Sequence, residues 1–301
     1  MAGAMPVAAL DRWDLAAKTY GLNFPRASVY AMSAHRLPAR RVLRDAGPIH
    51  LILASPECTS HSLAKGNARR CERSRETAFE VIRFARVLKP RWIVVENVAQ
   101  MQRWRKFGRW LKSIEALGYH TTLGVLNAQD HGVPQSRRRL FVLCDLKRNP
   151  ALPAPRSADL RTVQEVLGTG ESKKAPWRFA SLKTPARAAA TVKRAEVAIE
   201  AVGPHEPFIM VYYGTDGAGG FQRLNRPLRT ITTLDRFALI RPNGSGHEMR
   251  MLQPPELAAG MGFPSSHKWP ATSRRNRIRL IGNAVCPPLM RDIVLSLTRG
   301  G

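Results

Sequence analysis

Acidic residues are scarce in this sequence. Its 301 residues include 22 Asp and Glu but 48 Lys and Arg, which gives a formal net charge of +26 at pH 7. Such an excess of positive charge argues against partners that are themselves cationic and makes nucleic acid the leading expected partner. Hydrophobic residues make up 44% of the chain, which is typical of a folded, enzyme-sized protein rather than a ribosome-like one.

Cysteines are few and widely separated. The four are Cys58, Cys71, Cys144 and Cys286, and no two of them form a Cys-x-x-Cys pair. Zinc ribbons need such closely spaced pairs, and disulfide scaffolds need a denser set of cysteines. We therefore predict no metal site and no disulfide framework, and a reducing compartment fits.

Long hydrophobic runs are also missing. No stretch approaches the about 20 apolar residues of a membrane span. The N-terminus has no charged segment followed by an apolar one, as a secretion signal would have. These absences predict a soluble, cytoplasmic protein without a membrane partner.

Short apolar runs alternate with amphipathic stretches in the first half of the chain. Strands are expected at 50–54, 92–96, 121–126 and 140–144, and helices at 76–88 and 104–117. This alternation predicts an α/β fold with an open, mostly parallel sheet.

The composition shifts to Pro, Ala, Arg and Ser after residue 147, which marks a domain boundary. We predict a first domain over 1–147 and a smaller β-containing domain over 148–265, with strands at 208–214, 229–233 and 237–242. The segment 266–301, which contains a helix that starts at Pro287, is expected to return to the first domain.

Two reactive side chains follow predicted strands. Cys58 comes just after the strand 50–54, and Glu96 ends the strand 92–96. Reactive groups of open α/β sheets gather outside the carboxyl ends of the strands. From the residues alone, Cys58 is either a nucleophile or an inert small side chain, and Glu96 is either a site carboxylate or a helix cap.

Two further stretches are basic. Gln135, Arg137 and Arg139 alternate along an extended segment, so they share one face, which is either functional or a solvated strand edge. In residues 101–110, aromatic side chains alternate with cations. This pattern favours the core face of a helix over a nucleic-acid surface.

The order of these patches resembles the DNA (cytosine-5)-methyltransferase family. The matching motifs, in chain order, are Pro56-Glu57-Cys58, Glu96-Asn97-Val98, Gln135-Ser136-Arg137-Arg138-Arg139, Arg226-Pro227-Leu228-Arg229-Thr230 and Gly282-Asn283-Ala284-Val285, and residues 250–264 also look like the family's segment before the last motif. The resemblance implies a Rossmann-like methyltransferase fold with 1–147 as catalytic domain and 148–265 as target-recognition domain. It further implies S-adenosylmethionine as cofactor and double-stranded DNA as partner. The expected activity is methylation of a flipped-out cytosine at carbon 5, in a prokaryotic or phage protein of restriction-modification or orphan type that is cytoplasmic and nucleoid-associated.

The resemblance also assigns roles. Cys58 would add to carbon 6 of cytosine, Glu96 would bind the ring nitrogen N3 and the exocyclic amine, and Arg137 or Arg139 would hold the carbonyl oxygen. The expected cofactor-binding residues are Asp11, Pro56, Asn283, Ala284 and Val285. The expected DNA-binding residues are Ser62, Lys65, Arg69, Arg70, Gln135, Arg226 and Thr230. The base that removes the proton from carbon 5 is not identified.

The sequence departs from the family at its N-terminus. It has no Phe-x-Gly-x-Gly-Gly loop, it has Ser33 where the family has an adenine-binding Asp, and Glu57 and Thr59 replace the usual neighbours of the nucleophile. The match begins one strand and one helix late. The chain is then a truncated product, a subunit that needs a second chain to supply the missing strand, or a non-catalytic DNA-binding relic. A methyltransferase that acts on RNA, including transfer RNA, is a further alternative.

Overall fold

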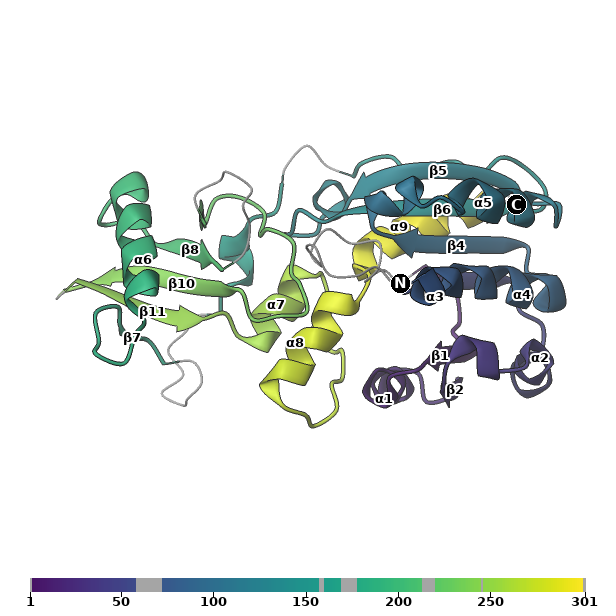
Figure 1. Ribbon diagram of the computed structural model, residues 1–301, viewed down its shortest axis with the longest axis horizontal. Coiled ribbons are helices and arrows are strands. Elements are labelled where there is room, and N and C mark those ends of the chain that lie inside the picture. The colour runs from purple at the N-terminus through teal and green to yellow at the C-terminus, as the bar shows by residue number, and fades with distance from the viewer. Residues whose placement is uncertain are drawn as a thin grey trace.

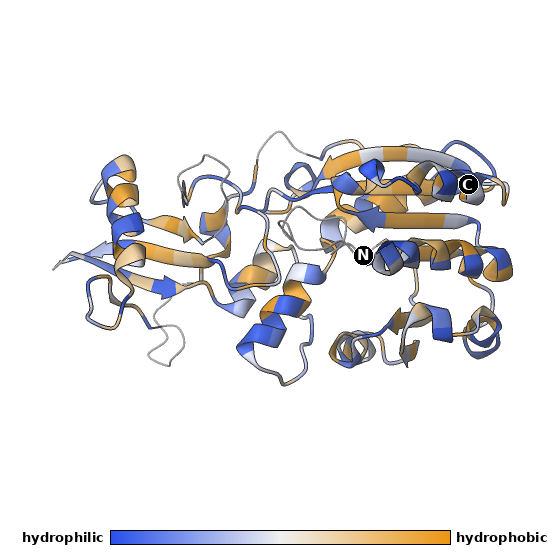
Figure 2. Cartoon of the chain, in the orientation of Figure 1, coloured by the Kyte–Doolittle hydropathy of each residue, from blue (hydrophilic) through white to orange (hydrophobic). Residues whose placement is uncertain are grey.

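The computed structural model describes residues 2–57, 72–156, 160–168, 178–212, 220–244 and 246–299. The molecule is elongated, with a larger lobe that holds residues 2–57, 72–156 and the C-terminal helix at one end and a smaller lobe at the other (Figure 1). Hydrophobic residues concentrate on the strands of both lobes (Figure 2). Each lobe therefore has a sheet with its own core.

The larger lobe is built on a four-stranded sheet. Its order is β3 (Leu51–Ala54), β4 (Trp92–Asn97), β6 (Arg138–Asp145) and β5 (His120–Asn127). β3 and β4 are parallel, but β6 is antiparallel to both of its neighbours. The expected mostly parallel sheet is thus corrected to a mixed one, because the short 128–137 connection allows β5 and β6 to form an antiparallel pair without a crossover helix.

Helices cover both faces of this sheet. On one face, α4 (Phe79–Leu88) and α5 (Phe107–Glu115) pack on the alternate strand residues Ile93, Val95, Leu140 and Val142. On the other, α9 (Pro287–Thr298) packs near Val94, Phe141 and Leu143. Trp104 and Trp110 are buried in the first of these cores, so the prediction of a core face at 101–110 is confirmed.

The N-terminal residues form a separate two-stranded parallel sheet. It consists of β1 (Ala8–Asp11) and β2 (Ser28–Ala31), connected by α1 (Asp14–Asn23) and followed by α2 (Ala39–Ala46). A small cluster of Tyr30, Leu37, Val42 and Leu88 attaches this unit to α4. In the described part of the chain, neither β1 nor β2 pairs with the four-stranded sheet.

The smaller lobe is an antiparallel sheet backed by one helix. The strand order is β7 (Ala180–Ser181), β11 (Gly246–Met251), β10 (Phe237–Asn243), β8 (Phe208–Val211) and β9 (Phe221–Arg223), and α6 (Ala189–Val202) packs on one face. The strands expected at 208–214 and 237–242 correspond to β8 and β10. The strand expected at 229–233 is wrong, because this segment belongs to no sheet and bonds to residues 134–137 of the larger lobe.

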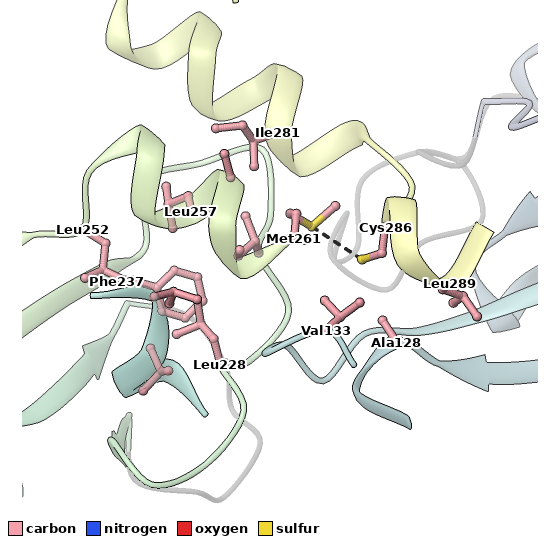
Figure 3. Close-up of a cluster of buried hydrophobic side chains, with 14 of the residues drawn as sticks. Ala128, Val133, Leu228, Phe237, Leu252, Leu257, Met261, Ile281, Cys286 and Leu289 are labelled. Atoms are coloured by element: carbon pink, nitrogen blue, oxygen red, sulfur yellow. Dashed lines mark hydrogen bonds between the residues drawn. The ribbon is translucent and has the colours of Figure 1, made fainter. Parts of the chain in front are cut away.

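Two helices lie between the lobes, namely α7 (Pro254–Gly260) and α8 (Arg274–Asn283) (Figure 1). They join both sheets through one buried cluster that includes Leu228, Phe237, Leu257, Met261 and Cys286 (Figure 3). The stretch Arg274–Thr298 is long and apolar enough to cross a membrane by length and composition. Half of its most apolar window is buried within the protein, as in the core helix of a globular fold.

Candidate active site

The sheet register brings Glu96 and Arg139 together. Glu96 lies near the end of β4 opposite Phe141 of the antiparallel neighbour β6, so Arg139 is its diagonal neighbour on the same face. The Nε atom of Arg139 is 3.2 Å from Oε1 of Glu96, whose side chain is only 10% exposed. Two residues expected in one site are therefore in contact.

Burial sets the protonation of this carboxyl group. It raises the pKa of Glu96 above its usual value, against the opposing influence of the Arg139 and Arg137 charges and a hydrogen bond with Ser55. A buried carboxyl with a raised pKa keeps its proton at higher pH than an exposed one. It can then donate a hydrogen bond to a ring nitrogen and act as a general acid.

Asn97 connects this pair to the strand end that leads to Cys58. Its Nδ2 donates to the carbonyl of Pro56 at 3.0 Å, and its Oδ1 accepts the Val98 N–H at 2.9 Å. Because the Asn97 side chain is buried, its hydrogen bond holds Pro56 beside the end of β4. We did not predict this role, although Asn97 stands inside the Glu-Asn-Val motif. Cys58 itself lies outside the described residues.

Arg137 has a different environment from Arg139. Its guanidinium donates to the carbonyl of Ile231 at 2.9 Å, of Gly282 at 2.9 Å and of Ala284 at 3.2 Å. The residue is 4% exposed. Arg137 therefore ties β6 to two other motif segments, and of the two arginines it is Arg139 that lies beside Glu96.

Gln135 is fully buried rather than exposed. Its amide nitrogen donates to the Gly260 carbonyl at 3.3 Å and to Met261 Sδ at 2.9 Å, and its oxygen accepts the Ile231 N–H at 2.8 Å. Its expected contact with DNA stays a prediction. The amide braces the junction between the lobes, because the backbone at 134–136 pairs with Leu228 and draws the side chain inside.

The other expected DNA contacts are distributed differently. Arg226 is exposed, whereas the hydroxyl of the half-buried Thr230 donates to the Ser136 carbonyl at 2.9 Å. Their contacts with DNA stay predictions. The residues Ser62, Lys65, Arg69 and Arg70 lie outside the described part of the chain.

Of the expected cofactor residues, Asp11 lies at the end of β1. Asp11 is exposed there, and its Oδ1 accepts the Trp13 N–H at 2.7 Å. Partial burial raises the pKa of Asp11, while the bond from Trp13 and the charges of Arg12 and Arg279 oppose this. The guanidinium of Arg279 lies 4.4 Å from the centre of the Trp13 ring. A carboxylate beside a flat aromatic ring fits the hydroxyls of a ribose and the base it carries.

The helix α8 brings the last motif toward the same place. Arg279 and Asn283 are four residues apart on α8, so both lie on the face that approaches Trp13. Asn283 is exposed, and Ala284 and Val285 pack partly on the core. Sequence reasoning missed Trp13 and Arg279, for which the only signal was their spacing from Asp11 and Asn283. Among the described residues, no group of three His, Cys, Asp or Glu side chains could hold a metal ion.

The sequence model of the C-5 cytosine-specific DNA methylase family matches residues 1–299. The chain belongs to this family. The buried pair of Glu96 and Arg139 lies within the matched residues.

Characterised relatives include the type II methyltransferase M.DdeI of Desulfomicrobium norvegicum, which is 30% identical over 48% of this chain and 36% of its own length. M.XorII of Xanthomonas oryzae is 31% identical over 56% of the chain and 41% of its own length. A putative type II methyltransferase of Methanocaldococcus jannaschii is 28% identical over 81% of the chain and 64% of its own length. The chain therefore spans less than two thirds of each of these relatives.

Solved structures share the fold. A putative DNA modification methyltransferase encoded within an E. coli prophage superposes with a TM-score of 0.71 at 18% identity, over 99% of this chain and 93% of that one. The Dnmt2 methyltransferase of S. pombe superposes with a TM-score of 0.66 at 18% identity, over 97% and 90%. The methyltransferase fold expected from the sequence is confirmed at this level.

Proposed function

We propose that this chain is an S-adenosylmethionine-dependent DNA (cytosine-5)-methyltransferase of prokaryotic or phage type, working beside a restriction enzyme or alone. One observation carries the proposal. Glu96 is a buried carboxyl with a raised pKa, and it is paired with Arg139 near the carboxyl end of β4. At the same strand end, Asn97 donates a hydrogen bond to Pro56, which lies two residues before Cys58.

The chemistry explains why these groups are needed together. The thiolate of Cys58 adds to carbon 6 of cytosine while the Glu96 carboxyl gives a proton to N3, and carbon 5 becomes nucleophilic. Arg139 holds the carbonyl oxygen of the ring. After carbon 5 has taken the methyl group and lost its proton to a base, the bond from carbon 6 to sulfur breaks, N3 returns its proton to Glu96 and Cys58 leaves as thiolate.

S-adenosylmethionine supplies the methyl group from its positively charged sulfur. Asp11 would bind its ribose, with Trp13, Pro56 and the segment 283–285 around it. The target base must leave the duplex to reach Glu96, at a cost of a few kcal/mol, which a strongly basic protein offsets by phosphate contacts. Its charge of +26 also supports a cytoplasmic location in association with the nucleoid.

We also propose that an added parallel strand, supplied by a second chain, pairs with β1 and β3. Among the described residues, each of these strands pairs on one edge only. Both are apolar in sequence, yet none of their residues is buried, and Leu53 is 49% exposed. Unpaired apolar edges attract strands. The β3 backbone amides that point away from β4 should exchange fast in the isolated chain, and slow exchange of these amides would contradict this proposal.

Methyl transfer from labelled S-adenosylmethionine to duplex DNA tests the proposed activity. We expect label on cytosine with the wild-type chain, loss of label in Cys58→Ser and retention in the control Cys71→Ser. Label on transfer RNA but not on DNA would favour the RNA alternative. DNA binding without any transfer, even with a complementing chain present, would favour a non-catalytic relic.

A further inference from the structure

A hollow lined by cations shares no lining residue with the proposed active site. It has a volume of about 510 Å³, lies between α2 and α4, and is called the basic hollow below. Its lining residues are Arg40, Leu43, Arg44, Arg86, Val87 and Lys89. The two helices are at the end of the molecule opposite the smaller lobe (Figure 1).

Most of the charge in the basic hollow is unpaired. No carboxylate of the described chain lies within 4.0 Å of Arg40, Arg86 or Lys89, and only Arg44 has such a partner, Asp45 at 2.9 Å. Arg40 and Arg44 are one turn apart on α2, and Arg86 and Lys89 are neighbours at the end of α4. Like charges at these spacings repel each other, so the arrangement is unfavourable until an anion enters it.

A second open hollow of about 500 Å³ lies on α5. Its lining includes Arg109 and Lys112 and no acidic residue. The helix α4 contacts both α2 and α5, so the two hollows belong to one layer of helices. Two more exposed cations, Arg109 and Lys112, therefore lie on this layer of helices.

The lining indicates what kind of anion fits. Leu43 and Val87 are aliphatic, and the basic hollow contains no aromatic side chain on which a base could stack. It also offers no Asn or Gln to read base edges. A lining whose only polar groups are cations can contact the phosphate backbone but not the base edges. Such contacts recognise DNA independently of its sequence.

We propose that the basic hollow binds the phosphates of duplex DNA, on a segment other than the one held at the active site. The two contacts then act together on long DNA. The second contact keeps the enzyme near its substrate by raising the effective DNA concentration, without any role in chemistry or sequence choice. The position of this segment relative to the target rests on the proposed function, but DNA binding by the hollow does not.

A charge-matched pair of triple variants tests this. The first is Arg40→Gln, Arg86→Gln and Lys89→Gln. The control is Arg26→Gln, Lys147→Gln and Arg299→Gln, which removes three exposed cations that are scattered over the surface. Both variants lose the same net charge, so only the location differs.

The readout is the salt dependence of binding to a duplex of about 300 base pairs, roughly twice the persistence length of DNA. Each phosphate contact adds about 0.9 to the slope of log affinity against log salt, so a fourfold rise in salt should weaken the wild type about 40-fold more than the first variant. The control should follow the wild type. Methyl transfer to a duplex of about 12 base pairs, one helical turn, should be unchanged in both.

Equal salt slopes for the two variants would overturn the proposal, as would binding of anionic lipid vesicles by the hollow without binding of the duplex. Inorganic phosphate should raise the melting temperature of the wild type more than that of the first variant. If methyl transfer fails in every protein, also with a complementing chain present, while the slopes still differ, the proposed function is wrong and the DNA-binding hollow stands.

Discussion

The four-stranded sheet and the N-terminal β1–β2 sheet provide the two halves of one proposed reaction, and they are stabilised in different ways. Five of the six residues of β4 are buried, whereas none of the four residues of β1 is. Glu96 is held by a neighbouring strand, while Asp11 is exposed and contacts its own loop. The comparison teaches that the base-binding half is organised by its own sheet, and the cofactor half depends on contacts from elsewhere in the chain.

Those contacts come from the region around α8. Asn23 at the end of α1 donates to the carbonyl of Lys268 and accepts its N–H, both at 2.8 Å. Trp13 lies against Arg279. The position of the β1–β2 sheet relative to Glu96 is therefore set by the region around α8 together with the hydrophobic cluster that attaches this sheet to α4.

The largest expected effect concerns the base-binding half. Glu96→Gln keeps the size of the side chain but removes the acid, so methyl transfer should fall by about 10²- to 10⁴-fold. The exposed Glu206→Gln serves as the control and should keep wild-type activity. Folding, followed by circular dichroism, should be intact in both, and an active Glu96→Gln enzyme would remove this residue from the mechanism.

The pH dependence of stability sharpens the same assignment. Because folding raises the pKa of Glu96 above its ordinary 4.5, its contribution to stability is fully present below that value. It is lost as pH rises through the higher pKa of the folded state. Denaturant unfolding at a series of pH values should show this loss in the wild type and not in Glu96→Gln. Methyl transfer should decline over the same pH window, since the acid form of Glu96 disappears there.

Substitution of the two arginines should separate stability from activity. Arg137→Met leaves two buried carbonyls and one half-buried carbonyl without their donor and should lower the free energy of unfolding by about 3 kcal/mol. Arg139→Met should cost less stability and more activity. The measurements are denaturant unfolding and methyl transfer on both variants, and equal unfolding costs would contradict the distinction.

A smaller effect is expected where α8 meets the segment after Ile231. A Cβ atom at Gly282 would lie 2.2 Å from the carbonyl oxygen of Thr232, so Gly282→Ala forces backbone to move and should cost about 1–3 kcal/mol. Gly108→Ala on α5 meets no atom within 4 Å and should stabilise by about 0.5–1 kcal/mol. Thermal melting compares the two variants. An unchanged melting temperature in Gly282→Ala would show that the contact between Gly282 and Thr232 is loose.

The smallest effect is expected in the cofactor half. Asn23→Ala removes two hydrogen bonds to Lys268 and should cost about 1 kcal/mol of local stability. Native-state hydrogen exchange should accelerate in β1 and β2 but not in β4 and β6. Uniform acceleration would mean that the two sheets unfold as one unit, against the comparison made above.

Much of this arrangement could be predicted from the sequence. The apolar runs correctly predicted the strands β3 to β6. The position of Glu96 at a strand end was also correct, because the length of an apolar run can be read from the local sequence. The shared face expected for Gln135, Arg137 and Arg139 stays a prediction, because only Arg139 lies within β6 and the three side chains have different partners.

The partners of these side chains could not be predicted. Which arginine meets Glu96 depends on the antiparallel register that sets Glu96 opposite Phe141, and no local pattern encodes that register. The β-branched residues at 229–233 suggested a strand, but the segment instead makes side-chain hydrogen bonds with residues 135–137 of the larger lobe. Gln135 seemed polar enough for a surface, yet three internal partners compensate for its burial.

The central claim is that Cys58 is the nucleophile of a cytosine methyltransferase whose carboxyl and arginine are already in contact. Denaturing mass spectrometry of the chain after incubation with S-adenosylmethionine and DNA containing 5-fluorocytosine tests it most directly, because the fluorine blocks release of the enzyme. We predict a covalent, methylated adduct that maps to Cys58. An adduct at another residue, or methylated DNA without any trapped protein, would contradict the account.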